Sequence, residues 1–327
     1  MDVGREPGQT RSELRWSPMI IAESRDDYLR HAEVARFVAF VRKALEGSQP
    51  FHHEFQIRDR RRPPQLPNVA AGKFKVAKLE QAFDSYWWDR NGFDVNKARL
   101  DAVQISVATA VQAECQSPST ADVLAHDALA AVLEWGAGGQ SASLYRSNMA
   151  WAAQAVADSM EGNPGLAERL RAGRAVLDAD APDYTIFNAS FGPRMNAGLT
   201  KYFSLACQQS IIYDGRVGAA LGLLVRSMLE LDDPQLPEVP KELRFPYGAQ
   251  NPGKNRTAAQ ALNRNPSKSR FVFTNLGNRS MNWAMWNCRA NWILTKAIAE
   301  SNASWCKAAD GLRRVEAALF TVGYCMP

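Results

Sequence analysis

The sequence predicts a mostly α-helical fold with few short strands. Apolar residues recur with a helical period over most of the 327 residues, and 46% of the residues are hydrophobic, as in globular proteins. The chain has no internal repeat. It also has no run of about 18 apolar residues, so we expect no membrane span.

The N-terminal part predicts a series of helices. The first covers Asp26–Gly47, where Tyr28, Phe37 and Val41 follow the helical period and Gly47 is a stop signal. A short β-like run, FHHEF, follows it. Thr120 and Asp122 stand where a helix N-cap is expected. The further helices expected here are Lys75–Trp88, Val95–Cys115, Thr120–Trp135, Ser141–Met160 and Leu166–Leu177.

A second helical block begins near Asn196. An acidic, proline-rich stretch, LDDPQLPEVPKEL, and a polar, Asn-rich stretch over Tyr247–Ser280 interrupt it. Two more helices are expected at Asn282–Ser301 and Ala308–Phe320. We therefore divide the chain into a flexible leader (1–20), an N-terminal helical region (21–180) and a C-terminal helical region (181–327).

Cysteine and histidine usage argues against a structural metal or a disulfide framework. The five cysteines are scattered and none forms C-x-x-C, while the four histidines form no H-x-x-x-H pair. The N-terminal segment MDVGREPGQTRSELRW lacks the apolar core of a signal peptide. We expect a cytoplasmic protein, a monomer, with no metal and no cofactor.

Positive charge is concentrated near the C-terminus. The segment Lys241–Lys296 holds ten Lys or Arg residues and a single acid, Glu242, although the whole chain carries a net charge of only +5. Such localised charge is typical of binding to a polyanion, most often nucleic acid. A solvated basic loop with no partner is the alternative. The candidate DNA contacts in this segment are Lys254, Arg256, Arg264, Lys268 and Arg270.

Aromatic residues accompany the basic segment. Trp283 and Trp286 lie three residues apart on a predicted helix, and Phe245 precedes the Asn-rich stretch. Aromatic side chains beside a basic surface can stack on an extruded base. A tryptophan stripe on a helix also commonly packs in a core, and both interpretations stay open.

The stretch from Arg194 to Val225 carries the chemistry. A loop containing Gly198 leads into a helix near Leu199, and a short apolar run precedes Asp214 and a second helix with an apolar stripe. This places Lys201 in the first turn of one helix and Asp214 at the N-cap of the next. The positive end of a helix dipole lowers the pKa of a lysine, and a neutral lysine is a nucleophile. A nearby carboxylate can stabilise positive charge on a deoxyribose.

The pattern G-L-T-K, a helix, a short apolar run and Y-D before another helix resembles the helix-hairpin-helix DNA glycosylases, with the 8-oxoguanine DNA glycosylases as the nearest branch. The resemblance implies a helical glycosylase-like fold in which two halves surround a cleft. It places the catalytic lysine at Lys201, the catalytic aspartate at Asp214 and the hairpin glycine at Gly198.

The resemblance implies excision of a modified base from DNA by cleavage of the N-glycosidic bond, with a possible lyase step. The role could be in repair or in defence against phages with modified bases. The residues expected to contact DNA around the motif are Arg194, Asn196, Gly198, Thr200 and Arg216. The residues expected to line the base pocket are Tyr213, Phe245, Trp283 and Trp286.

Two other functions remain open. The chain could be a non-catalytic nucleic-acid-binding protein on a glycosylase scaffold, in which Asp214 is only a helix cap and Lys201 only a solvated residue. A nuclease is the third possibility. Metal-assisted phosphodiester hydrolysis needs clustered carboxylates, and the basic C-terminal segment offers none.

Overall fold

The structure is a computed structural model that describes residues 23–49, 52–56, 73–136, 140, 142–233, 235–249 and 263–326. The expected leader at 1–20 lies outside this part. Helices account for 63% of the described residues and strands for 4%, with eleven α-helices and one two-stranded sheet in this part of the chain. The predicted mostly α fold is confirmed.

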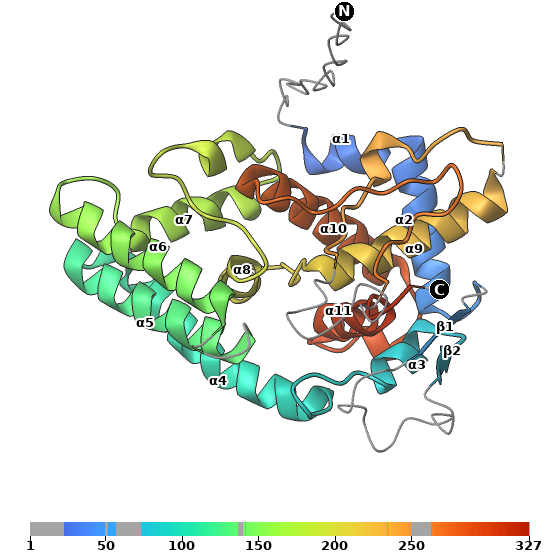
Figure 1. Cartoon of the computed structure of the whole chain (residues 1–327), viewed down its shortest axis with the longest axis horizontal. Coiled ribbons are helices and arrows are strands. Elements are labelled where there is room, and N and C mark those ends of the chain that lie inside the picture. The colour runs from blue at the N-terminus through green and yellow to red at the C-terminus, as the bar shows by residue number, and fades with distance from the viewer. Residues whose placement is uncertain are drawn as a thin grey trace, which may run out of the picture.

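One body of the molecule is a layered group of helices from the middle of the chain (Figure 1). Helix α5 contacts α4, α6 and α7, and both α4 and α5 contact α8. We call this group the α4–α8 lobe. Its helices are α4 (Phe93–Gln112), α5 (Pro118–Gly136), α6 (Ser143–Met160), α7 (Leu166–Leu177) and α8 (Leu199–Ala206).

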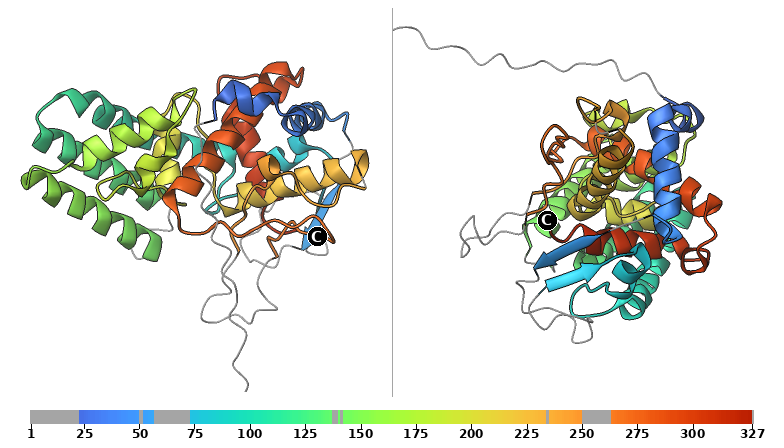
Figure 2. Two further views of the ribbon diagram at one scale, coloured as in Figure 1. Left: turned by 90° about the horizontal axis from the view of Figure 1, so that it is seen from above. Right: turned by 90° about the vertical axis from the view of Figure 1, so that its right-hand side faces the viewer.

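The other body combines both ends of the chain (Figure 2). Helix α10 packs on α2, and α11 packs on α3 and α9. We call this group the α9–α11 lobe. Its helices are α1 (Arg25–Arg30), α2 (Ala32–Leu45), α3 (Leu79–Asp84), α9 (Gly215–Asp232), α10 (Ser280–Glu300) and α11 (Gly311–Val322). Short 3-10 turns among the described residues are Ala113–Cys115, Tyr184–Asn188, Lys241–Leu243 and Ser304–Cys306.

The two lobes do not follow the expected boundary between the N-terminal and C-terminal regions at residue 180. Helices α1–α3 belong to the expected N-terminal region, yet they pack on α9–α11. The reason is burial: Phe37 and Val41 on the apolar face of α2 are completely buried, and the Phe37 ring packs at a tilt on Phe245 at a centroid distance of 6.1 Å. Of the helices described in the expected N-terminal region, those between residues 93 and 177 belong to the α4–α8 lobe.

The sheet replaces part of a predicted helix. Strand β1 (His53–Gln56) pairs antiparallel with β2 (Lys73–Val76), with His53 opposite Val76. The predicted helix at Lys75–Trp88 is therefore wrong at its start, and α3 begins only at Leu79. Phe74 and Val76 are both buried, so these residues satisfy the two-residue period of a strand.

A second difference concerns Asp122, which was expected to cap its own helix. Helix α5 already begins at Pro118, and the Asp122 carboxylate accepts from the backbone N–H of Ala167 in α7 at 2.8 Å. A Cβ atom on Gly165 would lie 2.4 Å from this carboxylate. Asp122 of α5 therefore caps the N-terminus of α7, and this hydrogen bond joins the two helices.

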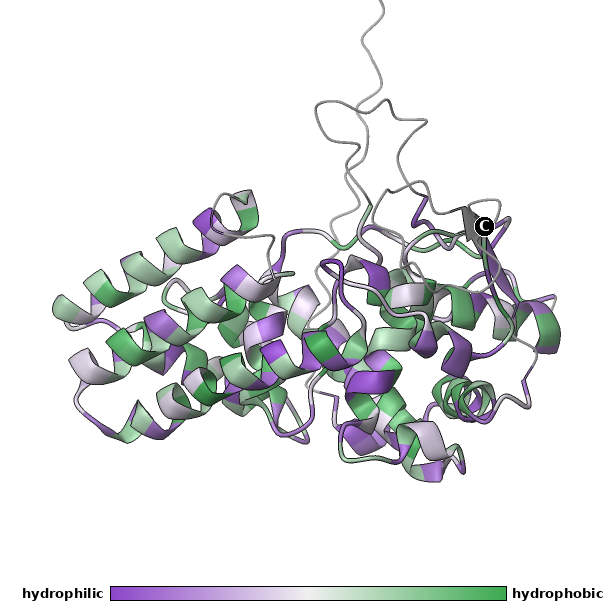
Figure 3. Cartoon of the chain, turned by 90° about the horizontal axis from the view of Figure 1, so that it is seen from below, coloured by the Kyte–Doolittle hydropathy of each residue, from purple (hydrophilic) through white to green (hydrophobic). Residues whose placement is uncertain are grey.

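The hydrophobic core runs through both lobes. Leu129 and Leu133 of α5, and Leu221 and Leu224 of α9, are completely buried. Figure 3 shows that the helices of both lobes carry polar as well as apolar residues. Helix α9 is buried on all sides over Val217–Arg226. Among the residues described, no helix combines the length and the hydropathy that crossing a bilayer requires.

Candidate functional site

The loop before α8 is fixed to α6 by asparagine side chains. The Asn196 Oδ1 atom accepts from the backbone N–H groups of Gly198 at 2.8 Å and Leu199 at 3.1 Å, so it satisfies donors at the start of the helix. The Asn196 amide donates to Oδ1 of the fully buried Asn148 at 2.8 Å. A Cβ atom on Gly198 would lie 2.4 Å from the Asn148 amide nitrogen. A glycine is needed at position 198 because the Asn148 side chain lies too close to the backbone to leave room for a Cβ atom.

Arg194 holds the same loop in place. Its guanidinium donates to the backbone oxygen of Ser147 at 2.9 Å and to the Ser147 hydroxyl at 3.0 Å. Arg194 and Asn196 were expected to contact DNA phosphates. In the structure their polar groups are used within the protein, and they fix the position from which α8 begins.

Lys201 lies on the first turn of α8 with only 8% of its surface exposed. Its alkyl chain packs on Gly136, where a Cβ atom would lie 2.3 Å from Lys201 Cδ. The amine donates to the backbone oxygen of Ala197 at 2.5 Å. Burial lowers the pKa of Lys201, while the negative charges of Asp214 and Glu316 oppose this shift. The low pKa was expected from the helix dipole, but burial is its main cause.

Asp214 caps α9 with one of its two carboxylate oxygens. Oδ1 accepts from the backbone N–H groups of Arg216 at 2.8 Å and Val217 at 3.1 Å, as the predicted N-cap requires. Oδ2 accepts no hydrogen bond from the residues described. The residue is half-buried. Capping therefore leaves one oxygen available to a ligand.

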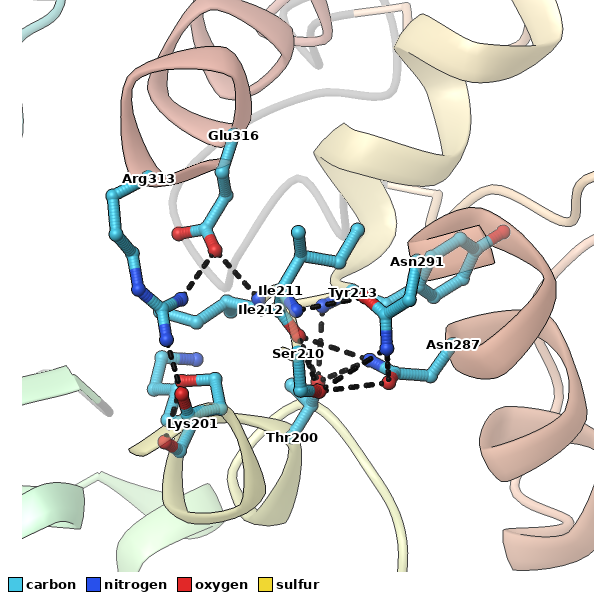
Figure 4. A network of polar contacts seen from close by, with 11 residues as sticks. Thr200, Lys201, Ser210, Ile211, Ile212, Tyr213, Asn287, Asn291, Arg313 and Glu316 are labelled. Carbon is cyan, nitrogen blue, oxygen red and sulfur yellow. Dashed lines mark hydrogen bonds and ion pairs between the residues drawn. The ribbon is translucent and has the colours of Figure 1, made fainter. Parts of the chain in front are cut away.

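The connection from α8 to α9 is held by side chains from two other helices (Figure 4). The backbone N–H of Ile211 donates to Asn291 Oδ1 at 2.8 Å, and that of Ile212 donates to Glu316 Oε2 at 2.7 Å. Backbone groups outside helices and sheets need such partners when they are buried. Asn291 belongs to α10 and Glu316 to α11.

Thr200 completes this network. Its hydroxyl accepts from the backbone N–H of Tyr213 at 2.9 Å and from the Asn287 amide at 3.1 Å. The Asn287 amide also donates to the backbone oxygen of Ile211 at 3.0 Å. Thr200 precedes Lys201, and Tyr213 precedes Asp214. The network therefore fixes the two predicted catalytic residues relative to one another, although their side chains form no ion pair.

Two arginines lie beside Asp214. The Arg216 guanidinium faces three aromatic rings, with centroid distances of 4.2 Å to Phe320, 5.0 Å to Tyr324 and 5.5 Å to Trp88. Burial and the neighbouring charge of Arg264 lower the pKa of Arg216 to about 10. Neither arginine forms an ion pair with a carboxylate of the residues described, and Arg264 Nε is buried without a hydrogen-bond partner there. Two cations with unused donors suit an anion.

A cavity of about 920 Å³ lies between α4, the end of α8, the C-terminal half of α10 and α11. Ser204 and Leu205 line it one turn after Lys201, and Tyr86 and Glu316 form part of its wall. Glu316 lies close enough to Asp214 for the two carboxylate charges to interact. Neither Lys201 nor Asp214 is among the residues that line the cavity. Its size falls within the usual range for small-molecule sites.

The residues expected to form a base pocket lie in the core instead. Tyr213 and Phe245 are completely buried, and Trp283 and Trp286 are 7% and 9% exposed. The Tyr213 hydroxyl donates to the backbone oxygen of Pro246 at 2.8 Å, and Trp286 packs on Phe245. None of these four residues lines the large cavity. Their assignment to a base pocket is corrected to structural core.

The basic C-terminal residues are not gathered in one place with the motif. Lys268 and Arg270 are exposed, and Lys268 lies 3.7 Å from Glu230. Arg264 lies near Asp214. Lys254 and Arg256 lie outside the described residues.

Sequence reasoning missed Glu316, Asn287 and Asn291. The only available signal was the i, i+4 pair of asparagines in a tryptophan-rich helix, a polar stripe on a face that should be buried. Glu316 has no such signal, because it lies 104 residues from its partner Ile212.

Comparison with protein-family models, with curated proteins and with solved structures gave no match to this chain. Among the described residues, no three His, Cys, Asp or Glu side chains are grouped so that they could hold a metal ion.

Proposed function

We propose that the protein is a DNA glycosylase that excises a modified base by cleaving the N-glycosidic bond. The observation that supports this most is the pairing of Lys201 and Asp214. A buried amine with a lowered pKa and a carboxylate with a free oxygen begin consecutive helices, and a network from α8, α10 and α11 fixes their spacing.

The proposed reaction begins when the bond between C1′ and the base nitrogen breaks. Its electron pair leaves with the base, and positive charge develops on the sugar. Oδ2 of Asp214 is placed to stabilise that charge, because Oδ1 alone serves as the helix cap. In the simplest outcome, water then adds to C1′ and gives its proton to Asp214, which leaves an abasic site.

In the lyase outcome, the amine of Lys201 adds to C1′ instead of water. This step needs the neutral amine, and burial raises the neutral fraction by lowering the pKa. The amine would leave the Ala197 oxygen as its proton passes to the Asp214 carboxylate, and its nitrogen would bond to C1′. The C1′–O4′ bond then breaks as a proton moves from that nitrogen to O4′, which gives a protonated imine and an open sugar ring. If Lys201 does not attack, its role is to position the sugar.

Arg216 and Arg264 would bind the phosphate beside the extruded nucleotide. Their guanidinium groups offer donors that the described residues leave unused, and α9 adds the positive end of its dipole. The cavity of about 920 Å³ would hold the base. Its volume suits an oxidised purine as well as a bulkier base from a phage genome, so repair and phage defence are both retained.

The test is incubation of the protein with duplexes that carry oxidised, alkylated or phage-type modified bases, followed by detection of abasic sites. Release of a base supports the proposal, and absence of release across the panel contradicts it. Borohydride reduction then separates the two outcomes, because it traps an imine on Lys201 but leaves simple hydrolysis without a cross-link.

A second function is favoured by one contact. The Lys201 amine donates to the Ala197 oxygen and makes no contact with Asp214. This geometry also suits a non-catalytic DNA-binding protein in which both residues are structural. Such a protein binds duplexes in a salt-dependent manner and releases no base, and Lys201→Ala only weakens its affinity.

A further inference from the structure

Glu316 uses only one of its two carboxylate oxygens within the protein. Oε2 accepts both from the backbone N–H of Ile212 at 2.7 Å and from the Arg313 guanidinium at 2.6 Å (Figure 4). No donor among the described residues is bound to Oε1. The residue belongs to the wall of the large cavity. Because two donors hold Oε2, turning the carboxylate would break both hydrogen bonds, and this favours one orientation of Oε1.

Asn96, another residue of the cavity wall, holds a buried acceptor without a partner among the residues described. Asn96 is only 3% exposed and lines the cavity. Its Nδ2 donates to the backbone oxygens of Trp88 at 2.8 Å, Asn91 at 2.9 Å and Gly92 at 3.1 Å, which fixes the amide orientation. Its Oδ1 is buried and accepts no hydrogen bond from the residues described. An unpartnered buried acceptor costs free energy unless a ligand or water donates to it.

We propose that Glu316 determines specificity by selecting bases that present an exocyclic amino group. This inference rests on the proposed glycosylase function and names the substrate class of the cavity. A carboxylate oxygen accepts a hydrogen bond from an amino group such as that of cytosine, whereas it repels the carbonyl oxygen that replaces the amino group in uracil.

The test measures binding to matched bases that differ only by an amino or an oxo group. The duplexes carry cytosine or uracil, and adenine or hypoxanthine, each opposite a tetrahydrofuran spacer so that no base pair must be broken. The full chain carries Asp214→Asn, which prevents turnover and keeps a capping side chain. We expect about tenfold tighter binding of the amino member of each pair, which corresponds to about 1.4 kcal/mol.

The decisive variant is Glu316→Gln. The donors from Ile212 and Arg313 require an oxygen at the position of Oε2, so the new amide must turn its NH2 group toward the cavity. The preference should then reverse in favour of the oxo bases. The matched control is Glu300→Gln, a change at the exposed end of α10, which should keep the amino preference.

Equal binding of the two members of each pair by the Asp214→Asn protein overturns the inference. An amino preference that survives when Glu316→Gln is added overturns it as well. Neither result affects the glycosylase proposal if the protein releases a base from other duplexes. If no duplex loses a base, the proposed function fails and this inference fails with it. If Glu316→Gln does not fold, the inference is still tested, because the Asp214→Asn protein alone shows whether amino bases bind more tightly than oxo bases.

Discussion

The side-chain amide of Asn287 donates to the hydroxyl of Thr200 at 3.1 Å and so connects the middle of α10 to the first turn of α8. Asn287 is completely buried. It lies 87 residues from Thr200 in the sequence, and this contact helps to fix where Lys201 and Asp214 stand relative to each other.

Asn287→Ala should lower the free energy of unfolding by about 1–3 kcal/mol, because it removes the buried amide that donates both to the Thr200 hydroxyl and to the Ile211 backbone oxygen. Denaturant unfolding measures the change. The control is Asn278→Ala at an exposed position, which should change stability by less than about 0.5 kcal/mol. Equal effects of the two substitutions would contradict the role of the network.

Gly136→Ala should displace the Lys201 side chain while the fold is kept. The new methyl group would lie 2.3 Å from Lys201 Cδ, the middle of a flexible side chain that can move. We expect borohydride cross-linking to DNA to fall by at least about tenfold, because misplacing a reacting group by about 1 Å costs roughly 100-fold. Gly92→Ala is the matched control, because a Cβ atom there meets nothing within 4 Å. Unchanged cross-linking by Gly136→Ala would contradict the proposal that the position of the Lys201 amine determines its attack on C1′.

The stability of the protein should rise with pH through Lys201. Burial lowers its pKa in the folded state. Between this lowered pKa and the ordinary value of about 10.4, the unfolded chain binds more protons, so the free energy of unfolding increases with pH. Lys201→Met removes the buried charge. The Lys201→Met variant should therefore be more stable than the native protein at pH 7. The difference between their free energies of unfolding should shrink toward pH 10.

Chemical denaturation at several pH values measures this difference. Lys43→Met, at an exposed position on α2, should show no such pH dependence. A constant difference between the native protein and Lys201→Met would mean that the amine is not buried as the structure has it.

His53 should make the protein sensitive to acid. Burial lowers the pKa of His53 to about 4 in the folded state, whereas the unfolded value is roughly 6.5. Below pH 6.5 the unfolded chain takes up a proton that the folded chain does not, so stability falls as the pH drops from 6.5 toward 4. The loss is about 3 kcal/mol. His53→Gln should flatten this part of the profile, whereas the exposed neighbour His52→Gln should leave it unchanged.

Much of the fold could be predicted from the sequence because its helices carry strong local signals. The predicted helix at Leu166–Leu177 matches α7, and Asp214 caps α9 as expected. Both depend on neighbours within a few turns. The predicted helix at Lys75–Trp88 is wrong at its start because Lys75 and Val76 pair with Glu54 and His53, which precede them by 21 and 23 residues.

The candidate site was only partly predictable. Lys201 and Asp214 could be found because they lie in one short segment with recognisable helix starts. Their supports, Asn287 and Glu316, come from helices 76 or more residues away, and only the tertiary fold brings them to Ile211 and Ile212. Trp286 was assigned to a pocket because an aromatic stripe gives the same pattern in a core as in a cleft.

The central claim is that the Asp214 carboxylate takes part in breaking the bond to the base. The most direct measurement is the rate of base release by Asp214→Asn, compared with Asp232→Asn at the exposed C-terminal end of the same helix. Asparagine also caps helices well, so α9 should remain intact. We predict that Asp214→Asn lowers the rate by at least about 100-fold with duplex binding retained, while Asp232→Asn releases base at the native rate. Native rates from both variants would contradict the claim.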